Sequence, residues 1–446
     1  MINTRELAVD TITEIFKNKL YSNIYLSKVL NDSNISEKDK GLFTEIIYGT
    51  IRYKSTIDYI LNSFMKNGIK KLKKDDPYLL NILRVAIYQI KYLDKVPDFA
   101  AVNEAVNISK KRCDMYKSKF VNGVLRNYLR NKTKFDNFKG NNFIQKLTLN
   151  YSFDTWMVEL FVRQYGKDVA EKILSGLNKR PQITMRVNSL KTDYDTAFEK
   201  LESIGYEIEE GRISPEAIYV KKGSNVEQNP LFTNGLVTIQ DESAMLVAEV
   251  MDIEDNLKVL DLCSAPGGKT THIAELMNNT GKILAFDIHE HKLGLIKENV
   301  KRLGINNVEL KIMDATMYNH NFVNIADRIL LDVPCSGLGI IRKKPEIKWN
   351  KNPQELSSLI KIQRDILMNA ADYLKPGGTL VYSTCTLNKS ENIDNIEWFL
   401  NKDSRFYVEK IFLGNSENFQ YDSLGSLTVL PNDYMDGFYI AKLKRK

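Results

Sequence analysis

The sequence predicts three parts: an all-helical front, a small α+β module, and a doubly wound α/β domain that completes the chain. Its 446 residues are 43% hydrophobic, which is enough for two to three domains with substantial cores. Apolar residues recur at helical spacing over the first third of the chain. From Val259 onward, short apolar runs end in polar residues and alternate with helical segments, as in a parallel sheet covered by helices.

The front part, residues 1–135, is predicted to be a bundle of five to seven helices. Its apolar residues repeat every three or four positions, which is typical of helices that bury one face. The clearest such segments are 5–18, 39–53, 78–93, 102–109 and 119–130. The polar stretch 132–142 is predicted to be a linker.

This front part is basic. Residues 1–140 hold 26 Lys+Arg and 15 Asp+Glu, a net charge of +11, so the rest of the chain carries −4 of the overall +7. A basic part beside a near-neutral part indicates a polyanionic partner, whereas the alternative is an ordinary Lys-rich surface. The positions that could form a phosphate-binding face are Arg112, Lys117, Lys119, Arg126 and Arg130.

The middle part, residues 143–234, is predicted to be the small α+β module. Residues 143–177 have helical periodicity around Trp156 and Phe161. Residues 183–188 alternate in polarity like a strand, and the module continues to about Val220. The segment 235–244 joins it to the last domain, residues 235–446.

The last domain is organised around the stretch VLDLCSAPGGKTT, residues 259–271. It predicts a buried strand, a tight turn at 264–268 and a helix from Lys269 to Met277. A glycine-rich turn between strand and helix is how a doubly wound sheet forms a nucleotide pocket. The turn matches neither the phosphate loop GxxxxGK[ST] nor the dinucleotide fingerprint GxGxxG.

Four later strands are predicted, and each also ends in polar residues. The second ends at Asp287, the third at Asp314, the fourth at Asp332 followed by Pro334-Cys335, and the fifth at Ser383-Thr384-Cys385. Because carboxyl ends of parallel strands meet at one edge of a sheet, we expect a single site there. A last strand is expected at 436–443.

The segments DLCSAPGGKT, LLDVPCSGLG and VYSTCT together resemble the S-adenosylmethionine-dependent RNA (cytosine-5) methyltransferases, often called the Nop2/Sun family. EIIYGTIR and KFVNGVLRNYLR resemble its NusB-like RNA-binding domain, and RVNSLKT resembles its RNA-contacting segment. The resemblance covers essentially the whole chain. It implies a Rossmann-like class I methyltransferase domain, in which a final antiparallel strand lies beside the fifth. As substrate it implies a cytosine of 16S ribosomal RNA, naked or in an early assembly particle.

The resemblance also implies how S-adenosylmethionine would be bound. Asp287 would hold the ribose hydroxyls, Asp314 the adenine amino group, and Asp332 would lie beside the cofactor. The turn would supply the remaining contacts, from Cys263, Ser264, Ala265, Pro266, Gly267, Gly268 and Lys269. By its position Cys263 favours packing over chemistry, and Lys269 either contacts the cofactor or has a structural role.

Carbon 5 of cytosine becomes nucleophilic only after a thiolate adds to carbon 6, so the chemistry needs a reactive cysteine. Residue type alone does not rank Cys335 and Cys385. The resemblance implies that Cys385 attacks, that Cys335 assists product release, and that Asp332 contacts the base near N3. The basic loop after Cys335 is expected to hold the RNA backbone beside a flipped base through Arg342, Lys343, Lys344 and Lys348.

Other features indicate what the chain lacks. The cysteines form no CxxC pair, Cys113 has no supporting context, and His289 and His291 suit a solvated helix start better than a metal site. No apolar run is long enough to span a membrane and the start has no signal core, so we expect a cytoplasmic protein. We also expect a monomer without a bound metal. The alternatives are a methyltransferase for another ribosomal or transfer RNA cytosine and a non-catalytic ribosome-assembly factor.

Overall fold

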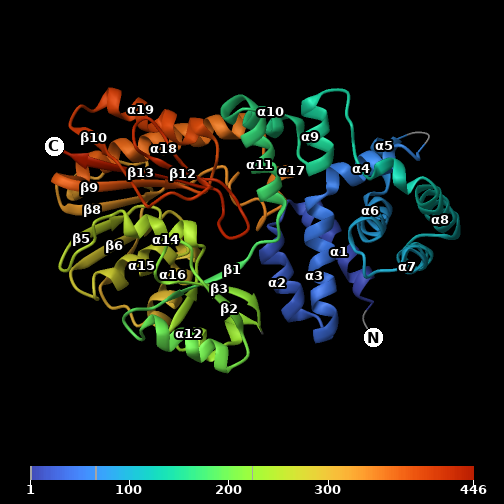
Figure 1. Ribbon diagram of the computed structural model, residues 1–446, viewed down its shortest axis with the longest axis horizontal. Coiled ribbons are helices and arrows are strands. Elements are labelled where there is room, and N and C mark those ends of the chain that lie inside the picture. The colour runs from blue at the N-terminus through green and yellow to red at the C-terminus, as the bar shows by residue number, and fades with distance from the viewer. Residues whose placement is uncertain (1–2, 66–67, 224) are drawn as a thin grey trace. The chain divides into compact units, whose positions relative to one another are not determined.

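The computed structural model describes residues 3–65, 68–223 and 225–446, which form two compact units (Figure 1). The first unit comprises Met1–Asn178 and Ile341–Lys351, and the second comprises Lys179–Ile340 and Asn352–Lys446. The compact units divide the chain after Asn178. The expected domain limits at 135, 143 and 234 remain predictions. No helix within the described ranges is both long and apolar enough to cross a membrane.

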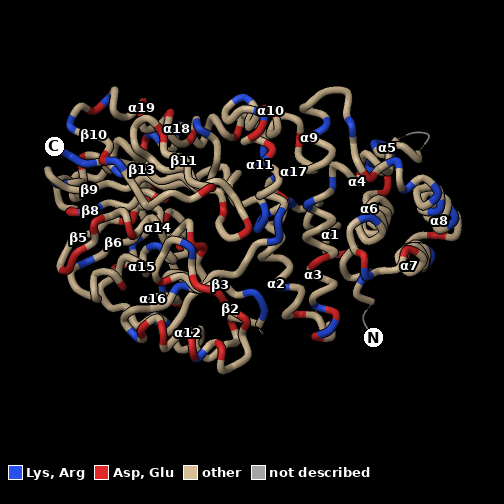
Figure 2. Tube along the Cα trace, viewed as in Figure 1, with Lys and Arg blue, Asp and Glu red and all other residues tan. Residues whose placement is uncertain are grey.

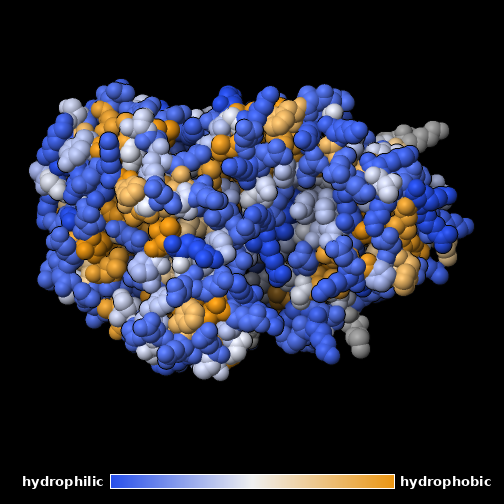
Figure 3. Space-filling view, in the orientation of Figure 1, coloured by the Kyte–Doolittle hydropathy of each residue, from blue (hydrophilic) through white to orange (hydrophobic). Residues whose placement is uncertain are grey.

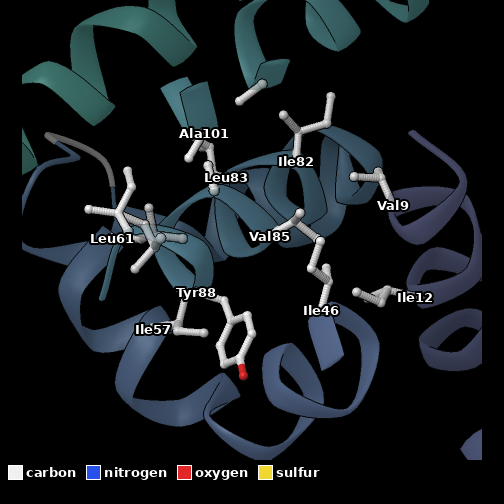
Figure 4. Packing of buried hydrophobic residues seen from close by; sticks show 14 of the residues in the cluster. Val9, Ile12, Ile46, Ile57, Leu61, Ile82, Leu83, Val85, Tyr88 and Ala101 are labelled. Atoms are coloured by element: carbon white, nitrogen blue, oxygen red, sulfur yellow. The ribbon is translucent and has the colours of Figure 1, made fainter. Parts of the chain in front are cut away.

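The first unit is helical, and α6 (Pro77–Tyr92) lies at its centre, packed against α1, α3 and α7. Asp76 caps α6 by accepting a hydrogen bond from the Leu79 backbone N–H at 3.0 Å. Figure 4 shows how α6 side chains meet those of neighbouring helices in one apolar core. The remaining helices are α1 Thr4–Asn18, α2 Ser22–Asp32, α3 Glu37–Arg52, α4 Lys54–Asn62, α5 Gly68–Asp75, α7 Asp98–Arg112, α8 Met115–Arg130, α9 Phe143–Tyr151, α10 Thr155–Tyr165 and α11 Lys167–Asn178.

The stretch 132–142, predicted to be a linker, is anchored instead. Phe135 and Phe138 are buried in the helical core, and a short 3-10 helix, η1 (Lys132–Phe135), carries the first of them. Lys91 Nζ donates a hydrogen bond to the Phe135 carbonyl at 2.5 Å. Two aromatic side chains therefore outweigh the polar composition on which the linker prediction rested.

The basic loop after Cys335 also differs from expectation. Residues 341–351, with α17 (Ile347–Asn350), belong to the first unit, where Arg342 and Lys348 are fully buried. Lys348 Nζ donates to the carbonyls of Arg52, Tyr151 and Ser152 at 2.9–3.2 Å and to Asn178 Oδ1 at 2.6 Å. Burial lowers the pKa of Lys348 well below that of an ordinary lysine. The prediction that Arg342 and Lys348 hold RNA phosphates is therefore wrong, because both side chains are structural; Lys343 and Lys344 are half-buried.

The second unit contains two sheets. The smaller is antiparallel with strand order β2-β3-β1-β4 and carries α12 (Tyr194–Ser203). Its strand β4 comes from the segment expected only to join two domains and pairs with β1. Its strands are β1 Ile183–Val187, β2 Glu207–Glu210, β3 Ala217–Lys222 and β4 Val237–Ile239. Two short elements, η2 Val226–Gln228 and α13 Pro230–Thr233, lie between β3 and β4 in the chain.

The larger sheet has the order β11-β12-β13-β9-β8-β5-β6-β7, with β10 also paired to β13. The five predicted strands, β5 to β9, lie parallel, and β13 runs antiparallel between β9 and β10, as expected. The strands are β5 Lys258–Asp261, β6 Lys282–Asp287, β7 Val308–Ile312, β8 Ala326–Asp332, β9 Leu374–Thr384, β10 Phe406–Glu409, β11 Phe419–Tyr421, β12 Leu427–Val429 and β13 Phe438–Arg445.

Helices cover both faces of this sheet because strand side chains alternate between them. Val259, Ile283 and Val381 pack with α14 (Glu242–Glu249), α15 (Gly268–Leu276) and α16 (Glu290–Leu303). Their neighbours along the strands pack with α18 (Pro353–Tyr373) and α19 (Ile393–Lys402) on the other face. Two short 3-10 helices, η3 His320–Phe322 and η4 Lys389–Glu391, complete the unit.

Candidate active site

The strand order of the larger sheet reverses at β5, which has β6 on one side and β8 on the other. In a doubly wound sheet the crevice beyond the carboxyl ends of the strands at such a reversal is where ligands bind. The turn after β5, the acids after β6 and β7, and the cysteines after β8 and β9 all belong to this edge. The structure therefore brings the predicted site residues to one place.

The turn between β5 and α15 is tied to the neighbouring strand. Ser264 donates from both its backbone N–H and its Oγ to the Phe286 carbonyl, each at 2.8 Å. Gly267 has φ +100°, and a Cβ there would press on Ile296, so only glycine fits. Cys263 packs against the core, and burial raises the pKa of its thiol well above the usual range. These features favour packing for Cys263, with Ala265, Pro266 and Gly268 completing the turn.

Lys269 and Asp332 form an ion pair, with Lys269 Nζ 2.6 Å from Asp332 Oδ2. Ser383 Oγ donates to the other carboxylate oxygen at 2.9 Å. This ion pair gives Lys269 a structural role, since it holds the carboxylate that is expected next to the base. Contact between Lys269 and the cofactor stays a prediction.

The two acids of the following strands each fix their own loop. Asp287 is buried and accepts the His289 backbone N–H at 2.9 Å. Asp314 is half-buried and accepts the backbone N–H and Oγ1 of Thr316 at 2.9 and 2.7 Å. In each loop, one carboxylate oxygen of the acid near the strand end thus fixes the residues that follow it.

Asp261, the last residue of β5, lies at the same edge of the sheet, although the sequence did not single it out. Thr270 Oγ1 donates to its Oδ2 at 2.6 Å, while its buried Oδ1 accepts no hydrogen bond from the described residues. Burial raises the pKa of Asp261 to about 7. The signal that could have found it is the one used for Asp287 and Asp314, an acid where an apolar strand ends.

Cys335 and Cys385 follow the ends of adjacent parallel strands, β8 and β9, and their sulfurs lie 3.3 Å apart. Gly339 contacts the second cysteine: its N–H donates to the Cys385 carbonyl at 2.9 Å, and a Cβ there would overlap the backbone of Gly437. The hydrogen bond with Cys385, together with burial, raises the pKa of Cys335 well above that of a free cysteine. Cys335 is therefore held as a thiol beside Cys385.

A buried ion pair connects the small sheet to the turn. Arg186 of β1 lies 2.7 Å from Glu275 of α15, and both side chains are fully buried. The same guanidinium donates to the Gly268 carbonyl at 2.9 Å and to Gln240. Arg186 thus helps to fix the start of α15. In the sequence, Arg186 stands out only as the first residue of RVNSLKT.

The remaining candidates are two histidines of the second unit and one cysteine of the first. His289 and His291 are exposed at the start of α16, and no three His, Cys, Asp or Glu side chains within 3–65, 68–223 and 225–446 are grouped to hold a metal. Cys113 follows α7 in the first unit and is half-buried.

The basic positions on α7 and α8 divide into two groups. Arg112 pairs with Glu6 and Asp10, and Lys117 pairs with Asp76. Lys119, Arg126 and Arg130 are exposed, and no ion pair is seen for them among the described side chains. Their spacing of seven and four residues puts these three on one face of α8. Figure 2 shows basic residues along α8, and Figure 3 shows that most of the surface in view is hydrophilic.

Comparisons with known proteins agree with this arrangement. The family described as 16S rRNA methyltransferase RsmB/F matches residues 248–444, the NusB family matches residues 2–130, and a ferredoxin-like domain of RsmF/B-like methyltransferases matches residues 153–227. The probable ribosomal RNA small subunit methyltransferase B of Bacillus subtilis is 39% identical, with all of this chain and 99% of that protein covered.

Solved structures give the same result. The crystal structure of PH0851 has a TM-score of 0.82 at 28% identity and covers all of this chain and 99% of that one. The crystal structure of NSun6 from Pyrococcus horikoshii with SFG has a TM-score of 0.58 at 25% identity, covering 65% of this chain and 97% of that one. With its NusB-like helical domain, small module and methyltransferase domain, the chain belongs to the 16S rRNA methyltransferase RsmB/F family.

Proposed function

We propose that the protein transfers a methyl group to carbon 5 of a cytosine in 16S ribosomal RNA, through a covalent bond between Cys385 and the base. The observation that carries the proposal is the pair of cysteines, 3.3 Å apart, beside an acid that a lysine and a serine hold in place. A methyltransferase acting on an already nucleophilic atom needs neither thiol.

In the proposed reaction the Cys385 thiolate adds to carbon 6, which makes carbon 5 nucleophilic. S-adenosylmethionine supplies the methyl group. Asp332 shares a proton with N3 as charge develops on the base. A solvent base then takes the proton from carbon 5, and the bond from carbon 6 to Cys385 breaks with its electron pair returning to the Cys385 sulfur. The Cys335 thiol assists this release by donating its proton to the departing thiolate.

The cofactor fits the residues of the turn. Asp261 Oδ1 is buried without a donor among the residues described, so it suits the ammonium group of the cofactor's amino acid part. Asp287 and Asp314 suit the ribose hydroxyls and the adenine amino group, because each is a fixed acceptor at a strand end. SFG, named with the NSun6 structure, is an analogue of S-adenosylmethionine.

Two observations support an RNA partner: the family name, and the net charge of +11 on residues 1–140. We propose 16S RNA, free or in an early assembly particle, as the substrate and a monomer as the active form. Purified protein should be incubated with S-adenosylmethionine and either 16S RNA, small-subunit particles or transfer RNA, and nucleosides should then be separated by mass spectrometry. 5-Methylcytosine in 16S RNA is the expected product. Methylation at another atom, or only in transfer RNA, contradicts the proposal.

A further inference from the structure

Glu391 is a fully buried carboxylate to which the mechanism above gives no role. It ends η4, six residues after Cys385, and lies in the second unit with both cysteines. Its oxygens accept hydrogen bonds from uncharged donors, and it forms no ion pair with any described Lys or Arg. A buried carboxylate is costly unless several donors converge on it, so this cluster is a built feature rather than a chance contact.

Glu391 reaches the loop of the first cysteine through Ser336, the residue after Cys335. The Ser336 backbone N–H donates to Glu391 Oε2 at 2.8 Å, and Ser336 Oγ donates to Oε1 at 2.5 Å. Gln363 of α18 adds a brace, since its Nε2 donates both to the Pro334 carbonyl at 2.9 Å and to Glu391 Oε2 at 3.0 Å. The backbone on both sides of Cys335 is therefore tied to one carboxylate.

The same carboxylate reaches the loop of the second cysteine. Asn388 Nδ2 donates to Oε1 at 3.1 Å, and Thr386, directly after Cys385, has its Oγ1 3.5 Å from Oε1 and 2.7 Å from Ser336 Oγ. The residues that follow the two cysteines thus meet at a single oxygen of Glu391. The carboxylate also adds to the rise in the pKa of Cys335, which keeps that thiol protonated.

We propose that Glu391 is a positioning residue that sets the spacing of Cys335 and Cys385, and with it the release of the methylated product; the second part rests on the proposed function. Each carboxylate oxygen faces at least one group that can only donate: Asn388 Nδ2 at Oε1, and the Ser336 N–H and Gln363 Nε2 at Oε2. In Glu391→Gln the new amide NH₂ therefore faces such a donor and leaves it unpaired. Ser336 has the two shortest contacts, so the Cys335 loop should shift most. Attack by Cys385 should then continue while release slows.

The spacing is tested without any methyl transfer by phenylarsine oxide, which condenses with two neighbouring thiols to form two As–S bonds and one water. Wild-type protein should bind one equivalent, and Cys335→Ala should bind none. Glu391→Gln should bind at least about 10-fold more weakly. The matched control is Glu242→Gln, since Glu242 is an equally buried carboxylate that accepts three backbone N–H bonds far along the chain from both cysteines.

Ser336→Ala keeps the proposal testable if Glu391→Gln does not fold, because it removes only the Oγ contacts; a several-fold loss of arsenical affinity is expected. With 16S RNA, Glu391→Gln should accumulate more covalent protein–RNA complex than wild type, and Glu242→Gln should not. Wild-type arsenical affinity in both Glu391→Gln and Ser336→Ala overturns the inference. If arsenical binding falls as expected but no cytosine is methylated, the spacing role stands and the proposed function fails.

Discussion

Lys269 Nζ lies 2.6 Å from Asp332 Oδ2, although 63 residues separate the two in the chain. Lys269 lies in the first turn of α15, the helix that follows β5, and Asp332 ends β8. The two residues meet because β5 and β8 are neighbours where the strand order of the sheet reverses. Ser383, at the end of β9, binds the second oxygen of the same carboxylate. One acid thus connects the turn after β5 with both strands that lead to the cysteines.

Asp332→Asn is expected to lower the single-turnover rate of methyl transfer by about 10²–10⁴-fold, because an amide cannot share a proton with the base. RNA affinity should change little. The control is Asp327→Asn, an acid at the other end of β8 that pairs with Lys375 at 2.7 Å. Transfer of labelled methyl groups into 16S RNA measures both. Equal rates for Asp332→Asn and wild type would remove Asp332 from the chemistry.

Asp261→Asn is expected to stabilise the free protein at pH 8 while weakening cofactor binding. An unfolded aspartate titrates near pH 4, whereas burial raises the pKa of Asp261 to about 7. Between these values the folded protein binds more protons than the unfolded chain, so this group makes stability fall as pH rises, by at most about 4 kcal/mol. Asparagine at position 261 does not titrate, so the variant should lose this decrease in stability with rising pH.

Urea unfolding at pH 5 and pH 8 measures the effect, with the exposed Asp255→Asn as control. Calorimetry with S-adenosylmethionine measures the loss of affinity. A variant with the pH dependence of wild type would show that Asp261 is already charged near pH 5.

Replacing Lys119, Arg126 and Arg130 together by alanine should weaken binding to 16S RNA and reduce its salt dependence. Each lost phosphate contact lowers the slope of log affinity against log salt by about 0.7–0.9, so the triple variant should lose roughly two. The control removes the same charge from exposed positions on α1, its C-terminal end and α2: Lys17, Lys19 and Lys28. Equal losses in both triple variants would mean that α8 has no special role.

Lys348→Met should destabilise the protein by about 2–5 kcal/mol, because the carbonyls that Lys348 satisfies lose their donor in a buried place. The exposed Lys361→Met serves as control and should be near neutral. Thermal unfolding is sufficient. A variant with a normal midpoint but weakened RNA binding would restore the phosphate role that the burial of Lys348 rules out.

The sequence predicted the larger sheet and the edge at which the candidate residues gather, because parallel strands bring their carboxyl ends to one side of a sheet. It placed Asp287, Asp314, Asp332 and the cysteine loops at one edge, where the structure has them. It could not predict that Lys348 is buried, because its acceptors lie on residues 52–178, far along the chain. Glu391 was missed for a similar reason, since its donors come from three separate segments.

The central claim is the division of labour between the two cysteines, and one gel tests it. Cys385→Ala and Cys335→Ala are each incubated with 16S RNA and labelled S-adenosylmethionine, denatured and separated by electrophoresis. Cys385→Ala should give neither methylated RNA nor a covalent complex. Cys335→Ala should transfer methyl and then remain attached, giving a labelled protein–RNA band that survives denaturation. The reverse pattern, or full activity in both variants, would contradict the account.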